Sequence, residues 1–175
     1  NTFAVSCTAV DSPIGHTGFA ALRVKDALVD HFRDRDRKRP SVSTVHPDIQ
    51  MQVFLKGTQA ALRLDLSGAS LHMRGYRSHG GDAPLKETLA AAIVQLAGWT
   101  AQAPKDAVFF DPLCGSGTLL IEAALIYGDS APGLLHRYFG FLGWRGHSAS
   151  LWQQELKEAR ERSKAGLERP WPRII

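Results

Sequence analysis

The residues with the clearest chemical potential lie in one loop, where Asp111 and Pro112 are followed by two glycines, Gly115 and Gly117. An apolar stretch precedes this loop and an apolar, helix-spaced stretch follows it. The order predicts a strand, a tight turn and a helix whose first backbone N–H groups are free. Such a helix N-terminus at the carboxyl end of a strand binds an anionic group and one face of a nucleoside. We therefore predict a nucleoside-binding loop.

Two other nucleotide-binding motifs fit this loop less well. A Walker loop needs a lysine to reach the phosphates, but Gly117 is followed by Thr118 and Leu119. A dinucleotide fingerprint needs a third small residue for close helix packing, and Leu120 occupies that position. A tight strand-to-helix turn without any ligand is the remaining alternative.

The string Asp-Pro-Leu-Cys-Gly-Ser-Gly-Thr at 111–118 resembles the S-adenosyl-L-methionine loop of class I methyltransferases. Together with segments 21–30, 64–77 and 83–91, it resembles the bacterial large-subunit rRNA guanine-N2 methyltransferases that carry a THUMP domain. This resemblance covers essentially the whole chain. It implies an α/β protein, in which the C-terminal part of a THUMP domain precedes the truncated start of a Rossmann-like class I methyltransferase domain.

The resemblance also implies a division of the chain. Residues 1–68 would form the THUMP part, 69–83 a glycine-rich connector, and 84–175 the N-terminal half of the methyltransferase domain. The family's catalytic Asn-Pro-Pro-Tyr segment does not occur in this sequence. We therefore expect the chain to be a piece of a longer enzyme, to contain no catalytic residue and to be inactive alone.

The donor S-adenosyl-L-methionine is the cofactor that the resemblance implies. The expected donor-binding residues are Asp111, Pro112, Cys114, Gly115, Ser116, Gly117, Thr118, Lys86 and Glu87. Asp111 could instead only cap the turn. Cys114 is expected to be a small residue packed in the turn rather than a nucleophile, because the loop contains no His or Lys to activate a thiol.

Two acidic residues leave alternatives open. Lys86 and Glu87 follow Pro84 in the expected first turn of a helix, where the carboxylate of Glu87 could simply favour the helix dipole. Glu122, one turn into the later helix, could be a solvated or packed acid, or could touch the donor pocket.

Basic residues predict contacts with RNA, and the resemblance names 23S rRNA or its precursor as the partner. The expected RNA-binding residues are Arg35, Arg37, Lys38, Arg39, Arg74, Tyr76 and Arg77. Arginines beside a tyrosine can hold phosphate and stack on a base. However, Asp34 and Asp36 could neutralise the first run and leave a solvated loop, and the later residues could belong to a solvated linker.

Hydrophobic periodicity predicts the elements that must position these residues. Apolar alternation indicates strands over 3–9, 49–55 and 62–66, the last two forming a hairpin, and helical spacing indicates a helix over 18–33. In the second half, we expect a helix from Pro84 to Gly98, a strand over 107–110, helices over 117–127 and 151–165, and the start of a strand at 173–175.

Composition narrows the function classes. The 175 residues are 44% hydrophobic, which supports a packed core, and carry a net charge of +4 that permits an RNA partner. The two cysteines do not suggest disulfides, so we expect a reducing cytoplasm. No apolar run approaches the length of a membrane span, and the histidines and cysteines lack metal-ligand spacing, so we expect no membrane partner and no bound metal. The functional alternatives are an RNA-binding module without catalysis and a related tRNA or DNA amino-methyltransferase.

Overall fold

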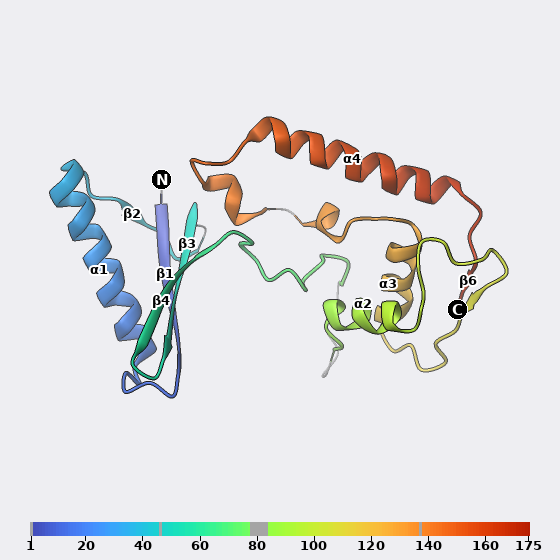
Figure 1. Cartoon of the computed structure of the whole chain (residues 1–175), viewed down its shortest axis with the longest axis horizontal. Coiled ribbons are helices and arrows are strands. Elements are labelled where there is room, and N and C mark those ends of the chain that lie inside the picture. Colours follow the sequence, from blue (N-terminus) through green and yellow to red (C-terminus); the bar gives the residue numbers. More distant parts are fainter. Residues whose placement is uncertain (1, 46, 78–83, 137) are drawn as a thin grey trace. The chain divides into compact units, whose positions relative to one another are not determined.

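The computed structural model describes residues 2–45, 47–77, 84–136 and 138–175, and the expected α/β class is confirmed. The chain forms two compact units (Figure 1). The first unit consists of Asn1–Ala69 and Tyr138–His147, and the second of Ser70–Arg137 and Ser148–Ile175. Residues 78–83 of the expected connector lie outside the described residues.

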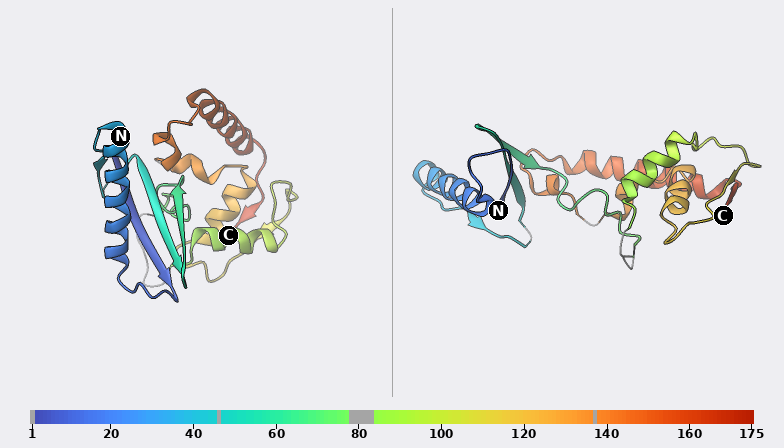
Figure 2. Two further views of the ribbon diagram at one scale, coloured as in Figure 1. Left: turned by 60° about the vertical axis from the view of Figure 1, so that its left-hand side comes forward. Right: turned by 90° about the horizontal axis from the view of Figure 1, so that it is seen from below.

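The first unit is built on a four-stranded sheet. In the order β2-β1-β3-β4, the strands are Ser41–Val42, Thr2–Val10, Ile49–Lys56 and Gln59–Asp65. β1 runs parallel to both β2 and β3, whereas β3 and β4 are antiparallel. The helix α1, Thr17–Asp36, lies along one face of this sheet (Figure 2, left).

The register of the sheet explains where the core of the first unit lies. Cys7 pairs with Val53 and Val53 pairs with Leu62, so these three side chains share one face. Ala20 of α1 packs against Val53 on this face. Leu62 on the edge strand β4 is half exposed, because α1 covers β1 and β3 but does not extend over it.

The hairpin predicted from alternation is confirmed, but β4 begins earlier than expected. The connection contains only Gly57 and Thr58, and Lys56 pairs directly with Gln59. Gly57 has a φ of +55°, the left-handed conformation that glycine adopts without strain. The start of β4 was missed because Ala60 and Ala61 are small, whereas the prediction depended on the alternation of large apolar side chains.

α1 extends three residues beyond the predicted helix and ends at Asp36, so much of the expected charged loop is helical. Arg33 pairs with Asp30 across one turn at 3.1 Å, and such i,i+3 pairs support a helix. The left-handed φ of +52° at Arg37 then ends the helix.

The described residues of the second unit form a short sheet, three α-helices and the 3-10 helix η1, Pro132–Leu135. β5, Val108–Phe109, pairs in parallel with β6, Arg173–Ile174, so the hairpin and the strand near 108 belong to different sheets. The helices are α2, Glu87–Leu96, α3, Thr118–Tyr127, and α4, Ala149–Glu168. The strand start expected at 173 is therefore confirmed, and α4 is longer at both ends than its predicted range.

Aromatic packing joins α2, α3 and β5 in this unit. Trp99, just after α2, donates from its indole N–H to the backbone carbonyl of Ala123 in α3 at 2.9 Å. Its ring meets Phe109 of β5 edge-on, with the centroids 5.2 Å apart. Val94, Ala123 and Tyr127 complete the buried cluster. This core packs α3 against Phe109 at the end of β5.

The sequence did not predict that a segment from the second half of the chain would belong to the first unit. This segment, Tyr138–His147, contains the short 3-10 helix η2, Gly140–Gly143. The backbone N–H of Phe141 donates to the carbonyl of Leu66 at 3.0 Å. A Cβ at Gly143 would overlap the carbonyl of Asp48, so only glycine fits at that contact.

Within the described residues, no helix combines the length and apolar character that crossing a membrane requires.

Candidate functional site

The predicted loop connects β5 to α3 and its backbone has the shape that the glycines suggested. Gly115 and Gly117 have φ values of +54° and +75°, which strongly favour glycine. A Cβ added at Gly115 would meet no atom within 4 Å, so the loop borders open space there. Pro112 and Ser116 are exposed beside it. The loop therefore leaves room for a ligand to approach its backbone.

The N-terminus of α3 presents free donors at this loop. Gly117 is the N-cap residue and has no side chain to satisfy the first N–H groups of the helix. The partial positive charge of these groups suits an anionic ligand group. Thr118 is buried, and its hydroxyl lies 3.2 Å from that of Ser116.

Asp111 lies at the start of the loop and has a local structural role. Its Oδ1 accepts a hydrogen bond from the backbone N–H of Leu113 at 3.2 Å, which is an Asx turn. Its own N–H donates to the carbonyl of Ile175 and continues the β5–β6 pairing. The turn-cap alternative is thus observed, and a contact between this carboxylate and a donor stays a prediction.

Cys114 is exposed rather than packed in the turn, which corrects the expectation for this residue. Its Sγ lies 3.8 Å from the carbonyl oxygen of Gly115.

Lys86 and Glu87 differ in their surroundings, although the sequence placed both in the first helical turn. Lys86 precedes α2 in an extended conformation and is exposed. Glu87 is the first residue of α2 and is only 5% exposed. Pro84 does not begin the helix, because α2 starts three residues later. Glu87 is paired with Arg77, whose Nε lies 3.5 Å from its Oε1.

Glu122 is a buried acid whose carboxylate has two hydrogen-bond partners. It is 1% exposed, and its Oε1 accepts hydrogen bonds from Arg74 Nε at 3.1 Å and from the hydroxyl of Tyr76 at 3.0 Å. Burial, followed by the hydrogen bond to Glu122, raises the pKa of Tyr76 well above its usual value. Glu122 is therefore packed rather than solvated.

The segment predicted to contact RNA through Arg74, Tyr76 and Arg77 is thus engaged inside the second unit. Arg74 and Arg77 expose only 10% and 18% of their side chains. Their partners in α3, Glu122 for Arg74 and Thr118 for Arg77, lie more than 40 residues away in sequence. No local pattern could have paired these arginines with α3. Their RNA-binding role stays a prediction, and the contacts that the structure shows are internal.

The basic residues at the end of α1 divide into two groups. Arg35 donates twice to Asp36 at 2.8 Å, and this bond lowers the pKa of that carboxyl. Neutralisation by aspartates, the alternative considered from the sequence, therefore applies to Arg35. By contrast, Arg37, Lys38 and Arg39 are exposed, and none of them forms an ion pair with a described carboxylate.

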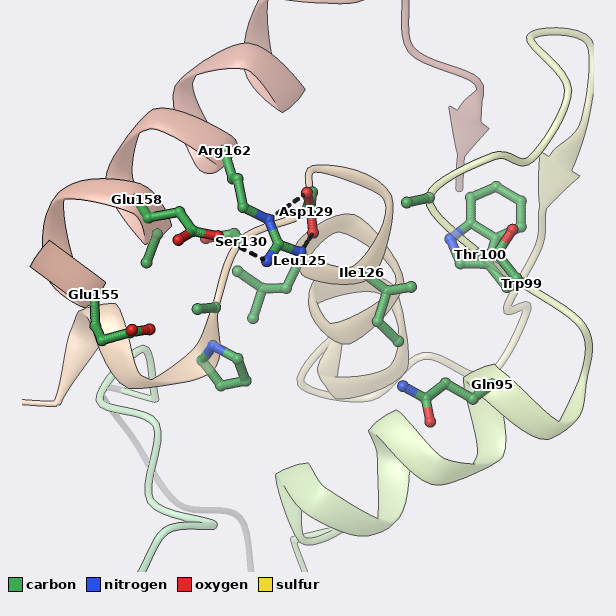
Figure 3. A pocket seen from close by; sticks show the side chains of 14 residues that line it. Gln95, Trp99, Thr100, Leu125, Ile126, Asp129, Ser130, Glu155, Glu158 and Arg162 are labelled. Carbon is green, nitrogen blue, oxygen red and sulfur yellow. Dashed lines mark hydrogen bonds and ion pairs between the residues drawn. The ribbon is translucent and has the colours of Figure 1, made fainter.

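A pocket of about 620 Å³ occupies a different part of the second unit (Figure 3). It lies among the C-terminal ends of α2 and α3 and the middle of α4, where Arg162 forms a two-fold hydrogen bond with Asp129. A helix of ten residues such as α3 is about 15 Å long. The pocket at its C-terminal end is therefore distinct from the loop at its N-terminal end.

The part of the chain that the structure describes contains no group of three His, Cys, Asp or Glu side chains able to hold a metal ion.

Comparison with known families gives two matches. Residues 74–170 match the family described as "RMKL-like, methyltransferase domain", and residues 1–65 match the THUMP domain. The "Ribosomal RNA large subunit methyltransferase K/L" of Desulfotalea psychrophila is 53% identical over 172 residues. That alignment covers 98% of this chain and 24% of the relative, so the chain spans about a quarter of its relative's length.

Two solved structures are also similar. One is described as a putative methyltransferase complexed with SAH, with 33% identity and a TM-score of 0.77 over 92% of this chain and 41% of that one. The other, from Listeria monocytogenes, is described as a predicted N6-adenine-specific DNA methylase, with 34% identity and a TM-score of 0.75 over the same shares.

Proposed function

Since the chain belongs to the RMKL-like methyltransferase family and carries THUMP sequence before that domain, we propose that it serves in S-adenosyl-L-methionine-dependent methylation of large-subunit rRNA. The observation that carries this proposal is the loop between β5 and α3, with its open glycine backbone and uncapped helix N-terminus. The similar structure with bound SAH supports the same ligand class.

The residues of the loop fit such a donor. The free N–H groups at the start of α3 suit the donor's carboxylate, and Gly115 and Gly117 allow close backbone approach. Asp111 is suited to accept from the donor's ammonium group, and Pro112, Cys114 and Ser116 form the exposed loop edge. When bound, S-adenosyl-L-methionine supplies the electrophilic methyl group. The protein's task is to orient donor and acceptor and exclude water.

For the acceptor, we propose the exocyclic N2 amine of a guanine in 23S rRNA. The support is the resemblance of segments 64–77 and 83–91 to guanine-N2 methyltransferases. The proposed division is 1–68, 69–83 and 84–175, with Tyr138–His147 of the last part packing within the first unit, and the proposed location is the cytoplasm. For RNA, the proposed principal phosphate contacts are Arg37, Lys38 and Arg39, because these residues are exposed and form no ion pair within 4 Å with a described carboxylate.

The experiment that tests this proposal identifies the methylated nucleoside. A full-length protein containing this chain, of the relatives' length, is incubated with labelled donor and unmodified 23S rRNA, and the RNA is digested for mass spectrometry. N2-methylguanosine is the expected product. N6-methyladenosine in DNA would instead favour the activity described for the Listeria protein. RNA binding without any product would favour a binding module. The 175-residue chain, assayed alone, should yield no product.

A further inference from the structure

One guanidinium group joins three segments around the proposed donor loop. Nη2 of Arg77 donates to the carbonyl of Leu85 at 2.8 Å and to Oγ1 of Thr118 at 3.1 Å. Nε of the same side chain faces Glu87 at 3.5 Å. Arg77 therefore links the connector to the residues that open α2 and to the first residue of α3.

These contacts are shielded from water. The side chains of Arg77 and Glu87 are 18% and 7% exposed, and Thr118 is 5% exposed as a residue. Charge-assisted hydrogen bonds of a planar guanidinium are strong and directional, and shielding strengthens them further. Both hydrogen bonds leave from Nη2, whereas Nε only faces Glu87 in an ion pair. Lysine could carry the charge, but its single nitrogen cannot occupy the positions of both Nε and Nη2.

The contact with Thr118 continues into the loop. Because Thr118 Oγ1 accepts from Arg77, its hydroxyl hydrogen is available to Ser116, whose Oγ lies 3.2 Å away. The bonds thus form a chain from Arg77 through Thr118 to Ser116. This chain fixes both hydroxyl groups next to Gly117, where the N–H groups of α3 are free.

A second set of contacts aligns the backbone that carries Arg77. Arg74 and Tyr76 both donate to Glu122, which lies four residues after Thr118 and so on the same face of α3. The segment 74–77 therefore lies along α3, with Arg77 at the start of the helix and Arg74 one turn further on. The direction of the Arg77 side chain is set by this arrangement.

We propose that Arg77 is a positioning residue of the donor site, which holds the Ser116–Thr118 part of the loop and the start of α2 in their binding geometry. This inference rests on the proposed function, because it takes the loop to bind S-adenosyl-L-methionine. It assigns to Arg77 a role inside the methyltransferase part of the chain, in place of a phosphate contact.

The test uses the complete 175-residue chain and two readouts. Calorimetry measures the affinity for S-adenosylhomocysteine, and hydrogen exchange without ligand measures the opening of residues 113–118. Arg77→Lys keeps a charge opposite Glu87 but loses the Nη2 position that donates to Leu85 and Thr118. Arg162→Lys is the matched control, because Arg162 also pairs with a carboxylate but at the other end of α3.

We expect Arg77→Lys to weaken binding about tenfold, the effect of losing one charge-assisted hydrogen bond, and to accelerate exchange in the loop. Arg162→Lys should change neither readout. Thr118→Val should reproduce the defect without touching the Arg77–Glu87 pair, whereas Thr118→Ser should restore binding. The double variant Arg77→Lys with Thr118→Val should bind no more weakly than Arg77→Lys alone, because the hydrogen bond that Thr118→Val removes is already lost in Arg77→Lys.

The proposal is overturned if Arg77→Lys leaves affinity within about twofold of the wild type and loop exchange unchanged. It is also overturned if Thr118→Ser and Thr118→Val weaken binding equally, or if the defects of Arg77→Lys and Thr118→Val add. If Arg77→Lys does not fold, the two Thr118 variants decide the matter. If the wild type does not bind S-adenosylhomocysteine, the proposed function fails, and the exchange readout still decides whether Arg77 orders the loop.

Discussion

Buried charge is concentrated in two carboxylates of the second unit, Glu87 and Glu122, and each has an arginine partner from the segment before α2. Removing a buried carboxylate from water is costly unless it is paired and hydrogen-bonded. The pairing therefore explains both the inward direction of Arg74 and Arg77 and the burial of Glu122. At the residue scale, these arginines stabilise the fold by pairing with buried carboxylates.

Glu122→Gln tests this pairing directly. The substitution keeps the size of the side chain but leaves Arg74 without a charged partner at a site where it is 10% exposed. We expect the free energy of unfolding to fall by about 3 kcal/mol, measured by urea denaturation. Glu161→Gln on the exposed side of α4 breaks only a surface pair with Lys157 and should cost less than about 0.5 kcal/mol. Equal effects of the two substitutions would show that Glu122 is not a buried anchor.

The pair formed by Asp129 and Arg162 predicts a dependence of stability on acid. The hydrogen bonds from Arg162 lower the pKa of Asp129 in the folded chain below its unfolded value. The contribution of this pair to the free energy of unfolding is therefore fully present above the pKa of Asp129 in the unfolded chain, about 3.9. It is lost as the pH falls through the lower pKa of Asp129 in the folded chain. Asp129→Asn should weaken the fall in the free energy of unfolding at acid pH and leave its dependence on alkaline pH unchanged, as measured by urea denaturation over a pH series. An acid limb identical to that of the wild type would exclude this role.

At the scale of elements, the sequence predicted the helices and strands whose apolar side chains or glycines form a clear pattern. α1, the hairpin of β3 and β4, and the turn into α3 follow from apolar spacing and from glycine, and their types were predicted correctly. The start of β4 and the role of Tyr138–His147 were missed, because alanines and glycines carry little periodic signal. The partners of Arg74 and Arg77 were missed because long-range side-chain pairing is set by tertiary packing.

The contact between α4 and Gly128, the residue that ends α3, gives a prediction at this scale. Gly166 of α4 packs so closely against Gly128 that a Cβ would overlap its backbone carbonyl. Gly166→Ala should therefore destabilise the chain by about 2 kcal/mol through overpacking, although alanine is the better helix former. Ala165→Gly, at the neighbouring exposed position, measures the effect of helix propensity alone and should destabilise the chain by about 1 kcal/mol. A stabilising Gly166→Ala, measured by thermal unfolding, would contradict the observed contact.

At the scale of the whole molecule, the residues proposed to bind RNA and those proposed to bind the donor lie in different units. The first carries the exposed cations that follow α1, and the second carries the loop between β5 and α3. The order of THUMP sequence before methyltransferase sequence could be predicted, because four segments resemble one family. The three crossings of the chain between the units, near residues 69, 137 and 147, could not be predicted, because no residue pattern marks them.

RNA binding by a full-length protein containing this chain should depend on the cations after α1. Replacing Arg37, Lys38 and Arg39 with Gln should weaken affinity and reduce the slope of log affinity against log salt by about 2 if all three contact phosphates. Sequence preference should change little, because phosphate contacts carry no base information. Lys157→Gln with Lys164→Gln on α4 is the control and should leave the slope unchanged. An unaltered slope in the triple variant would place the phosphate contacts elsewhere.

The loop from Asp111 to Thr118 is proposed to bind the S-adenosyl group, and calorimetric titration of the chain with S-adenosylhomocysteine tests this binding most directly. The wild type should bind, and Gly115→Val should weaken binding at least about tenfold by straining the loop and blocking backbone approach. Gly98→Val is the matched control, because Gly98 also has positive φ and open space but lies outside the loop. Circular dichroism should show both variants folded. Absence of binding by the wild type, or equal affinity of all three proteins, would contradict the account.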